Sequence, residues 1–283
     1  MSLSVHRADG PARRAGRGRL RVVVANGRST AVSVQATSPL KVLVPRSSGD
    51  SVWAYLSSFG GGLVAGDETD IDLDIGPGAR CFLGTQASTK VYRNPLGLPC
   101  GHRLRAVIGE GGVLVLAPDP VQAFAGSSYQ QRQEFRLAPG SGLVLVDGST
   151  SGRAARGERW GFDRYQSRND IFLGDDHLLA DSVLLDPADG PLDSPHRAGR
   201  FNAFALVALV GDPLADAALR MLADVAARPV ERRAPLVVAA SPIRGGAVLR
   251  VAGETVEEVG QEVRRHLGCL SGLLGEDPLA RRW

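Results

Sequence analysis

The chain lacks the features that mark membrane and secreted proteins. None of the apolar runs in its 283 residues reaches the roughly 18 to 20 residues of a membrane-spanning helix, and no hydrophobic signal core follows the N-terminal arginines. Its cysteines, Cys81, Cys100 and Cys269, are odd in number and widely spaced, which does not suit a disulfide framework. We therefore expect a soluble protein of the cytoplasm with no membrane partner.

Aromatic residues and lysines are also scarce. Aromatic residues make up only 5% of the chain, which leaves few rings to stack on sugars or nucleic-acid bases. Lys41 and Lys90 are the only lysines, so nearly all positive charge is arginine, and the net charge is only +3. The basic N-terminal cluster from Arg13 to Arg21 has no RNA-binding signature beside it. We expect residues 1–18 to be flexible and no nucleic acid to bind.

Glycine, in contrast, is abundant. The 35 glycines fall mostly between short apolar runs, a pattern typical of many turns that join many strands. The clearest strand covers residues 70–75, where apolar residues alternate with aspartates and so occupy opposite faces. Turn signals recur about every ten residues, which predicts an antiparallel sandwich or a stack of sheets.

Helices are expected only in the C-terminal third. Asp212 and Pro213 can begin the first helix, and Thr255 with Glu258 forms a capping-box pattern at the start of the second. Two short strands separate these helices, and we expect the apolar stripe of the second helix to be buried on the protein's own sheet. No Pro-rich or Ser-rich linker divides the chain, so residues 1–283 are expected to form a single, mainly β domain.

A glycine-rich segment ends at Asp67. It contains Gly60, Gly61, Gly62 and Gly66 and lies between two expected strands. Dinucleotide sites and P-loops place their glycines at a strand-to-helix turn, so that the N-terminus of the helix faces the phosphate. Because no helix is expected here, phosphate binding is disfavoured, and a tight crossover with glycines at positive φ is the structural alternative.

A second segment, Thr85-Gln86-Ala87-Ser88-Thr89-Lys90-Val91-Tyr92, places hydroxyl groups beside one of the two lysines. A Ser/Lys catalytic pair needs an oxyanion hole and a nucleophile held near the lysine, and this spacing guarantees neither. A polar strand end with satisfied hydroxyls fits the same pattern. The segment is therefore weak support for a hydrolase.

Together the two segments resemble the paired signature of the urease accessory family UreD, called UreH in some organisms. That signature is a glycine-rich loop ending in Gly-Asp, an aspartate-rich strand, and then Thr-Gln-Ala-Ser/Thr-Lys-Val-Tyr. The matching residues of this chain are Gly60, Gly61, Gly62, Gly66, Asp67, Thr85, Gln86, Lys90 and Tyr92. Further similarity appears in Pro118-Asp119-Pro120 and in the run from Gly152 to Trp160, whereas the C-terminal third matches more weakly.

The resemblance implies a scaffold or metallochaperone in the nickel-dependent maturation of urease, and not an enzyme. The family acts with UreF-like and UreG-like accessory proteins on apo-urease, and UreG is the GTP-hydrolysing nickel carrier. An internal water-filled passage for nickel has been proposed for the family, whose fold is described as stacked β-sheets of helicoid character with two helices. We therefore expect no catalytic residues and no tightly bound cofactor, only transient nickel.

Four residues are candidates for contact with nickel. Asp67 matches the aspartate that closes the family's glycine motif, and Asp181 stands where the family often has a glutamate. Carboxylates that line a wet path can hold a dication through water. Cys100 and His102 offer a thiolate and an imidazole, but only these two ligands are close in sequence. The structural alternatives are a turn aspartate, a solvated strand aspartate, and a loop cysteine with a surface histidine.

Two other functions fit parts of the sequence. A β-solenoid hydrolase acting on carbohydrate would use Asp70, Asp72 and Asp74, which share one face of a strand, as acid/base groups. Such catalysis needs two carboxylates separated across a substrate bond, and these three aspartates look more like a solubilising edge. An arginine-rich nucleic-acid-binding module is the second alternative, and it predicts strongly salt-dependent affinity.

Overall fold

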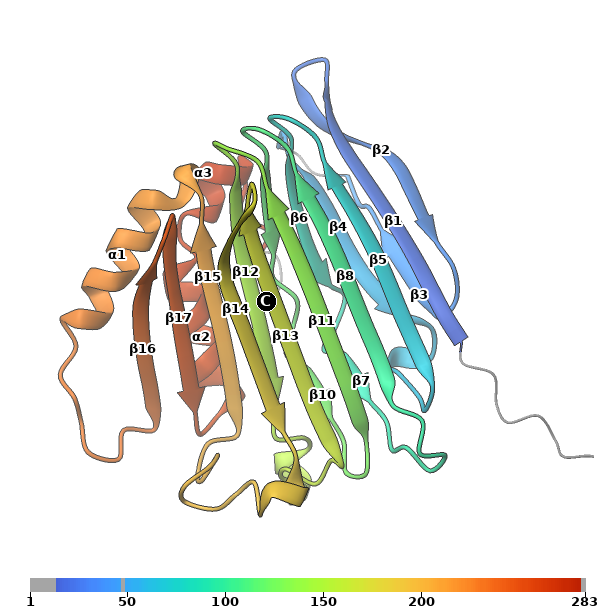
Figure 1. Cartoon of the computed structure of the whole chain (residues 1–283), viewed down its shortest axis with the longest axis vertical. Helices are drawn as coiled ribbons and strands as arrows, with labels where there is room; N and C mark the ends of the chain where they lie inside the picture. The colour runs from blue at the N-terminus through green and yellow to red at the C-terminus, as the bar shows by residue number, and fades with distance from the viewer. Residues whose placement is uncertain (1–13, 47–48, 281–283) are drawn as a thin grey trace, which may run out of the picture.

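Two β-sheets are stacked face to face, and three α-helices cover the outer side of one of them (Figure 1). This is a computed structural model, and it describes residues 14–46 and 49–280. The prediction of a mainly β chain of stacked sheets is confirmed, as is the order helix-strand-strand-helix near the C-terminus. A third, short helix follows the two that were expected.

The first sheet, called sheet A below, has seven strands in the order β14-β13-β11-β8-β5-β1-β2. Its strands are β1 (Arg14–Ala25), β2 (Arg28–Ala36), β5 (Asp67–Ile75), β8 (Cys100–Ile108), β11 (Ser128–Leu137), β13 (Arg164–Leu173) and β14 (Asp176–Leu185). Within the described ranges, no helix covers the outer face of sheet A (Figure 1).

The second sheet, sheet B, has ten strands, of which eight follow the order β16-β17-β15-β12-β9-β6-β4-β3 and two, β10 and β7, continue beside β12. Its strands are β3 (Leu40–Leu43), β4 (Val52–Ser58), β6 (Arg80–Thr85), β7 (Lys90–Val91), β9 (Val113–Leu116), β10 (Val121–Ala123), β12 (Gly142–Thr150), β15 (Ala203–Val210), β16 (Leu236–Ile243) and β17 (Gly246–Gly253). The helices are α1 (Ala215–Ala226), α2 (Val256–His266) and α3 (Leu270–Leu274), with 3-10 turns η1 (Phe59–Gly61), η2 (Ala154–Arg156), η3 (Pro187–Asp189) and η4 (Asp212–Leu214).

From β4 to β13 the chain coils between the two sheets, so that hydrogen-bonded neighbours there lie one full turn apart and run parallel, whereas strands toward the sheet edges pair antiparallel, for example β1–β2, β13–β14 and β16–β17. In sheet A the parallel pairs are β1–β5, β5–β8, β8–β11 and β11–β13, and in sheet B they include β4–β6, β6–β9 and β9–β12. The helicoid character that the resemblance implied is confirmed, but the antiparallel sandwich expected from turn spacing is wrong. Regular turn spacing cannot distinguish a hairpin from a coil, because it does not say which strands pair.

Tight turns of successive coils stack on one another at the ends of the strands. The amide of Gly78, between β5 and β6, donates to the carbonyl of Glu110, between β8 and β9, over 2.9 Å. A Cβ atom on Gly109 would lie only 2.8 Å from the backbone nitrogen of Pro77. Glycine therefore permits the close approach of neighbouring turns, which accounts for part of its abundance.

The arginines from Arg14 to Arg21 belong to β1 of sheet A. In the parallel register of β1 and β5, Arg17 lies beside Asp70, Arg19 beside Asp72 and Arg21 beside Asp74. On the opposite face of β1, Leu20 and Val22 are buried between the sheets. Residues 14–18 are part of β1, where residues 14–22 pair with β5 and the register with β2 begins at Gly18. The flexibility expected of residues 1–18 stays a prediction. Residues 1–13 lie outside the described part of the chain.

The aspartates of β5 lie on a central strand, which corrects the expectation of a solubilising edge. Arg105 on β8 places Nη2 2.9 Å from Asp70 and Nε 2.8 Å from Asp72. Arg21 on β1 places Nε 3.1 Å from Asp74. The three carboxylates are thus ion-paired with arginines of both neighbouring strands on an exposed face, and they form no acid/base pair across a cleft.

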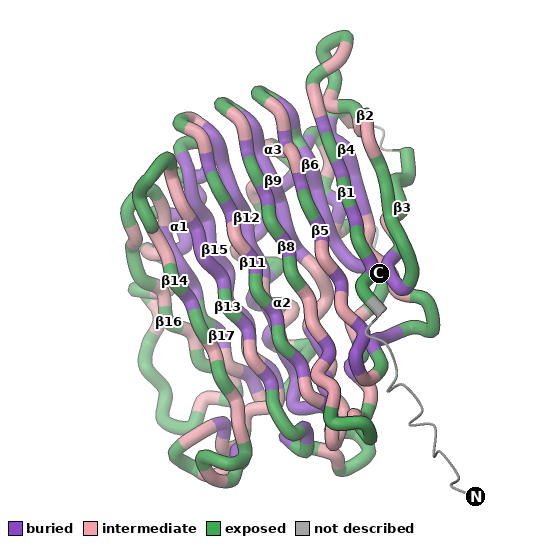
Figure 2. The backbone as a smooth tube through the Cα atoms, turned by 45° about the vertical axis from the view of Figure 1, so that its right-hand side comes forward, coloured by how far each residue is buried: buried purple, intermediate pink, exposed green. Residues whose placement is uncertain are grey.

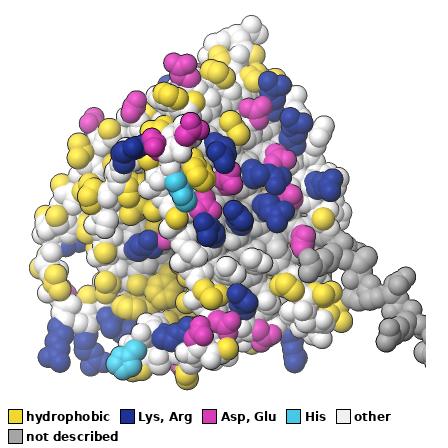
Figure 3. Space-filling view, in the orientation of Figure 1, with side chains coloured by type: hydrophobic (Ala, Val, Ile, Leu, Met, Phe, Trp, Pro, Cys, Tyr) yellow, Lys and Arg dark blue, Asp and Glu magenta, His cyan; other side chains and the backbone are white. Residues whose placement is uncertain are grey.

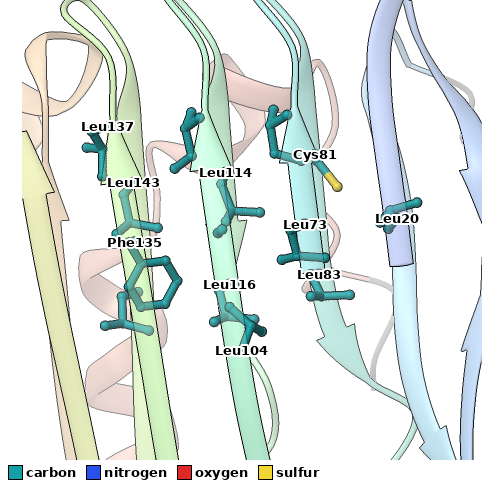
Figure 4. Close-up of a cluster of buried hydrophobic side chains, with 14 of the residues drawn as sticks. Leu20, Leu73, Cys81, Leu83, Leu104, Leu114, Leu116, Phe135, Leu137 and Leu143 are labelled. Atoms are coloured by element: carbon teal, nitrogen blue, oxygen red, sulfur yellow. The ribbon is translucent and has the colours of Figure 1, made fainter. Parts of the chain in front are cut away.

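Buried and exposed residues alternate along the strands of sheet A (Figure 2), because one face meets sheet B and the other meets solvent. Apolar side chains of the two sheets interdigitate in the core (Figure 4), among them Leu20, Leu73, Leu104, Phe135 and Leu137 from sheet A and Cys81, Leu83, Leu114, Leu116 and Leu143 from sheet B. Burial raises the pKa of the Cys81 thiol to about 12, so it behaves as an apolar group.

A second apolar layer lies between sheet B and the helices. Val259, Val263, Leu267 and Leu270 are buried there, so the predicted burial of the apolar stripe is confirmed for these residues, whereas Val256 at the start of α2 is exposed. The predicted capping box is also confirmed, since Thr255 Oγ1 accepts from the Glu258 amide over 3.1 Å and the Glu258 carboxylate accepts from the Thr255 amide over 3.2 Å. Among the described helices, none is long and apolar enough to span a bilayer.

Candidate functional site

The two signature segments lie against each other. The Leu63 amide donates to the carbonyl of Lys90 over 2.8 Å, and the Tyr92 amide donates to the carbonyl of Leu63 over 2.9 Å. Gly62 is extended at φ 169°. A Cβ atom there would lie 2.5 Å from Tyr92 Cε2 and 2.6 Å from the Lys90 carbonyl oxygen. The shape of the glycine-rich loop therefore depends on the second segment.

The other glycines of the loop serve its sharp turns. Gly60, Gly61 and Gly66 have φ angles of 82°, 73° and 82°, in the left-handed region that favours glycine. The loop leads into strand β5 and not into a helix. The predicted glycine crossover is thus confirmed, and the geometry of a phosphate-binding loop does not arise here.

The signature segments line one end of a cavity between the sheets, with a volume of about 210 Å³. Its lining there includes Ser57 and Ser58 at the end of β4, Gly61, and the exposed pair Gln86 and Ala87. At the base of this loop the Thr85 hydroxyl donates to the Asp119 carboxylate over 3.0 Å and accepts from the Asp119 amide over 2.9 Å. These bonds connect the second signature segment to the Pro118-Asp119-Pro120 segment within the lining of the cavity.

A row of polar side chains crosses the inner face of sheet A beside this cavity. In register, Thr69 on β5 is followed by His102 on β8, Gln131 on β11 and Ser167 on β13. The Thr69 hydroxyl lies 2.7 Å from His102 Nδ1. Burial lowers the pKa of His102 to about 4 despite the nearby Asp70, so the imidazole is neutral at neutral pH and can bind a metal ion.

Asp147 reaches this row from β12 of sheet B. Its carboxylate accepts hydrogen bonds from Gln131 (3.0 Å), Ser167 (2.6 Å) and Asn169 (2.8 Å). Asp147 lines the first cavity and also a second one of about 340 Å³, so the two cavities meet at this residue. Burial, with a contribution from Asp147, raises the pKa of Tyr129, and that phenol stays protonated.

The second cavity extends from Asp147 toward β14, β16 and β17. Apolar residues such as Leu185, Phe204 and Val237 form much of its lining. Asp181 on β14 also lines it and is 3% exposed; its Oδ1 lies 2.6 Å from Nη1 of Arg250 on β17.

In Figure 3 charged side chains gather over β5, β8 and β11, whereas hydrophobic side chains are more frequent over β15, β17 and β16.

The four residues predicted to contact nickel fall into two groups. His102 and Asp181 line the cavities, whereas Asp67 and Cys100 are buried beside the glycine-rich loop. The Asp67 carboxylate accepts from the Val64 amide over 3.0 Å, and the Cys100 thiol donates to the Val64 carbonyl over 3.0 Å. The alternatives of a solvated Asp181 and of a loop cysteine with a surface histidine are therefore wrong, because all three side chains are turned inward.

The protonation of Cys100 also bears on its role. Burial, with a contribution from Asp67, raises the pKa of this thiol to about 12. The thiol is therefore protonated at neutral pH, and a metal ion would have to displace its proton. Nickel contact by Cys100, like that by Asp67, Asp181 and His102, stays a prediction.

Away from the cavities, Asp224, Glu262 and His266 place ligand atoms within 4.8 Å of one another, the sole such group of three in the described ranges. Arg228 lies between the two acids, with Nη2 2.7 Å from Asp224 Oδ2 and 2.6 Å from Glu262 Oε1. Burial acts to raise the pKa of Glu262, but hydrogen bonds from Arg228 and His266 outweigh it and lower the pKa. The acids already have cationic partners, so we interpret this group as a connection between α1 and α2.

Sequence reasoning missed Asp147, Gln131, Gln133 and Asn169. None of them belongs to a motif in the sequence, and the residues share a site only because β11 and β13 pair in parallel and β12 lies opposite them. The alternation of Gln131 and Gln133 with exposed Arg132 was the available signal, since it turns both amides toward the inner face.

Comparison with known proteins agrees with the signature. The family model described as UreD urease accessory protein matches residues 14–283. Urease accessory protein UreD of Sorangium cellulosum is 50% identical over 271 residues, covering 95% of this chain and 85% of the relative. The protein of the same name from Anaeromyxobacter sp. is 41% identical, covering 95% and 90%. Urease accessory protein D of Arabidopsis thaliana is 35% identical, covering 93% and 99%. By these matches, which extend well beyond the two signature segments, the chain belongs to the UreD family of urease accessory proteins.

Proposed function

We propose that this protein is a non-enzymatic scaffold in urease maturation that guides nickel between its two sheets. The observation that carries the proposal is the meeting of two cavities at Asp147, which joins the signature loops at one end to Asp181 at the other. Relatives of high coverage are named urease accessory proteins, which supports the same role.

The lining of the cavities suits a cation that moves and is not stored. A neutral imidazole on His102 and carboxylates on Asp147 and Asp181 are acceptable to nickel, and water completes the coordination of a hydrated ion. Since these ligands are spread along two cavities, no closed set of protein ligands retains the ion. Such a path requires no covalent step and no tightly bound cofactor.

A path through the protein requires a donor at one end and an acceptor at the other. We infer that UreF-like and UreG-like proteins deliver nickel at one end and that apo-urease receives it at the other. The exposed loop with Gln86 and Ala87 lies at the end of the path formed by the first cavity. The apolar face over β16 and β17 lies beside the second cavity, at the other end. Both surfaces are of the kind that partner proteins cover.

The first test measures urease activity and nickel content in cells that express the urease operon with and without this chain. Activity and nickel are expected to fall together without the chain and to return when it is restored. Fully nickel-loaded urease in its absence would overturn the proposed function.

A second test narrows the path itself. Ala252 on β17 lines the second cavity, and Ala252→Trp would fill much of it. Ala180→Trp on exposed β14 is the matched control, since it adds the same side chain outside the cavity. We expect Ala252→Trp to lower the nickel content of urease while the chain still assembles with its partners, and Ala180→Trp to leave both unchanged.

A further inference from the structure

We propose that the free edge of β14 in sheet A binds an extended segment of a partner protein, which joins the sheet as one more strand over the uncovered part of sheet B. The segment has apolar side chains at alternate positions and an acidic residue near Arg232 and Arg233. The inference rests on the proposed function for the choice of partners, the proteins of urease maturation, and deepens it by naming how one of them is recognised.

The first argument is the uncovered face of β16. Sheet B extends past β14 on this side of the molecule (Figure 1). Val237 is 45% exposed on the face of β16 that points toward the layer of sheet A, and Ala239 and Ser241 on the same face are exposed as well. On the opposite face Leu236 and Val238 pack against the core beneath the helices. The layer that covers one side of β16 is thus missing on the other.

The second cavity continues onto this uncovered face. Apolar side chains of β14 and β16 line it there, namely Val183, Leu185, Val237 and Ala239. Arg250 of β17 also lines the cavity, but its Nη1 lies 2.6 Å from Asp181 Oδ1, so its charge is already neutralised. The floor of the site therefore accepts apolar side chains.

The second argument is the free edge of β14. In the described ranges this strand pairs only with β13. At every second residue of an edge strand the backbone amide and carbonyl point away from the sheet, where a new strand can pair with them. The irregularity in the pairing lies near Leu178, so residues 179–185 pair regularly with residues 165–171. β14 contains no proline, whereas the edge strand β16 contains Pro242, which cannot donate.

These two features together determine the occupant. A helix would cover the apolar floor, but its backbone hydrogen bonds are internal and the edge of β14 would stay unpaired. An extended segment pairs its backbone with β14 and turns every second side chain toward Val237 and Ala239. The occupant is therefore a strand whose apolar residues alternate.

The charge near the start of β16 adds a further requirement. Arg232 and Arg233 are exposed in the loop before Leu236, and their side chains form no ion pair with another described residue. Glu231 is the one acid of residues 227–235, so the loop keeps an excess of positive charge. A carboxylate at this end of the added strand would gain charge-assisted hydrogen bonds from the two arginines.

Fluorescence anisotropy of the full chain with short synthetic peptides that tile apo-urease and the UreF-like and UreG-like proteins tests the site. At least one peptide with alternating apolar residues should bind. Val237→Lys should weaken its binding by at least about tenfold, because an ammonium group would be covered by the added strand without a counter-ion. Ala239→Lys is a second variant on the same face. Val107→Lys is the matched control, since Val107 is 54% exposed on the outer face of sheet A, and it should bind as the wild type does.

Hydrogen exchange distinguishes an added strand from contact with side chains alone. The bound peptide should slow exchange of the edge-facing amides of β14 by at least about tenfold and leave β2, at the other edge of sheet A, unchanged. Arg232→Glu with Arg233→Glu should weaken the same peptide by severalfold. Unchanged exchange in β14 on binding would overturn strand addition, and unchanged affinity of the double variant would overturn the acidic residue assigned to the segment.

Two other outcomes would also reject the inference. In the first, no peptide binds, or the affinity of Val237→Lys and Ala239→Lys equals that of Val107→Lys. In the second, light scattering shows that the full chain is a dimer which Val237→Lys dissociates, so that a second copy occupies the edge.

The operon assay separates this inference from the proposed function. Fully nickel-loaded urease in the absence of the chain would reject the proposed function, whereas a peptide that adds to β14 would still support the strand site. Absence of peptide binding, with urease that still depends on the chain for nickel, would reject the strand site and leave the proposed function standing.

Discussion

Gly62 lies so close to Tyr92 that a Cβ atom on the glycine would be 2.5 Å from the ring carbon Cε2. The contact joins the two signature segments, which are separated in sequence by most of β5 and β6. Tyr92 in turn meets Phe124 edge to face, with ring centroids 5.5 Å apart. The two signature segments thus pack together as one unit beside the first cavity, whose lining includes Gly61, Leu63 and residues 85–89.

Gly62→Ala should lower the free energy of unfolding by about 2 kcal/mol, because the new methyl group forces Tyr92 and the Lys90 carbonyl to move. Urea unfolding measures the change. Gly272→Ala is the matched control: its Cβ would meet nothing within 4 Å in helix α3, so stability should be unchanged or raised by up to about 1 kcal/mol. Equal stability of the two variants would contradict the steric explanation.

Local features of the fold were predictable from the sequence, whereas strand pairing was not. The alternation in residues 70–75 correctly predicted β5, and Thr255 with Glu258 correctly predicted the start of α2, because both signals depend on near neighbours in the chain. Asp212 lies in η4 and not at the cap of α1, which begins at Ala215. The parallel coil was available only through the family resemblance, since its contacts join strands from different turns.

The candidate site, too, could be predicted from the sequence only in part. Asp67 and Asp181 were found by their place in the family pattern, yet only Asp181 lines a cavity. Asp147 was missed because its importance comes from Gln131 and Ser167 on the opposite sheet. A sequence can indicate which face of a strand a residue occupies, but the partner across the core depends on the register and stacking of the sheets.

Asp67→Ala should lower the free energy of unfolding by about 1 kcal/mol, because the Val64 amide loses its buried acceptor. Asp67→Asn keeps an oxygen at that position and should unfold at nearly the wild-type urea concentration. The conservative variant then tests nickel contact in the operon assay. A fall in urease nickel at wild-type stability would support contact by the charged carboxylate, and wild-type nickel would show that the negative charge of Asp67 is not needed for nickel delivery.

His102 should make stability dependent on pH between its two pKa values. The pKa of His102 is about 4 in the folded chain and 6.5 as the ordinary value. Between pH 4 and pH 6.5 the imidazole is therefore protonated in the unfolded chain and neutral in the folded chain. The contribution is fully present above pH 6.5 and is lost as pH falls toward 4, by at most about 3 kcal/mol. Urea unfolding across this range should show a smaller loss for His102→Gln. His196 is an exposed loop residue, so His196→Gln should show the same dependence of stability on pH as the wild type. The same dependence in the wild type and both variants would contradict the attribution of this effect to His102.

Arg228→Met should destabilise the connection between α1 and α2. Glu262 is 6% exposed and accepts from Arg228 at 2.6 Å and from His266 at 2.7 Å, so loss of the arginine leaves a buried carboxylate with a weaker partner. After discounting for the partial exposure of Arg228, we expect a loss of about 2 kcal/mol. Arg228→Met with Glu262→Gln should recover part of it, because the stranded charge is then gone. Arg21→Met is the control, because it breaks an exposed ion pair with Asp74, and it should lower the free energy of unfolding by less than about 1 kcal/mol in the same urea titration. An equal loss for both arginine variants would show that the burial of Glu262 does not increase the contribution of its ion pair to stability.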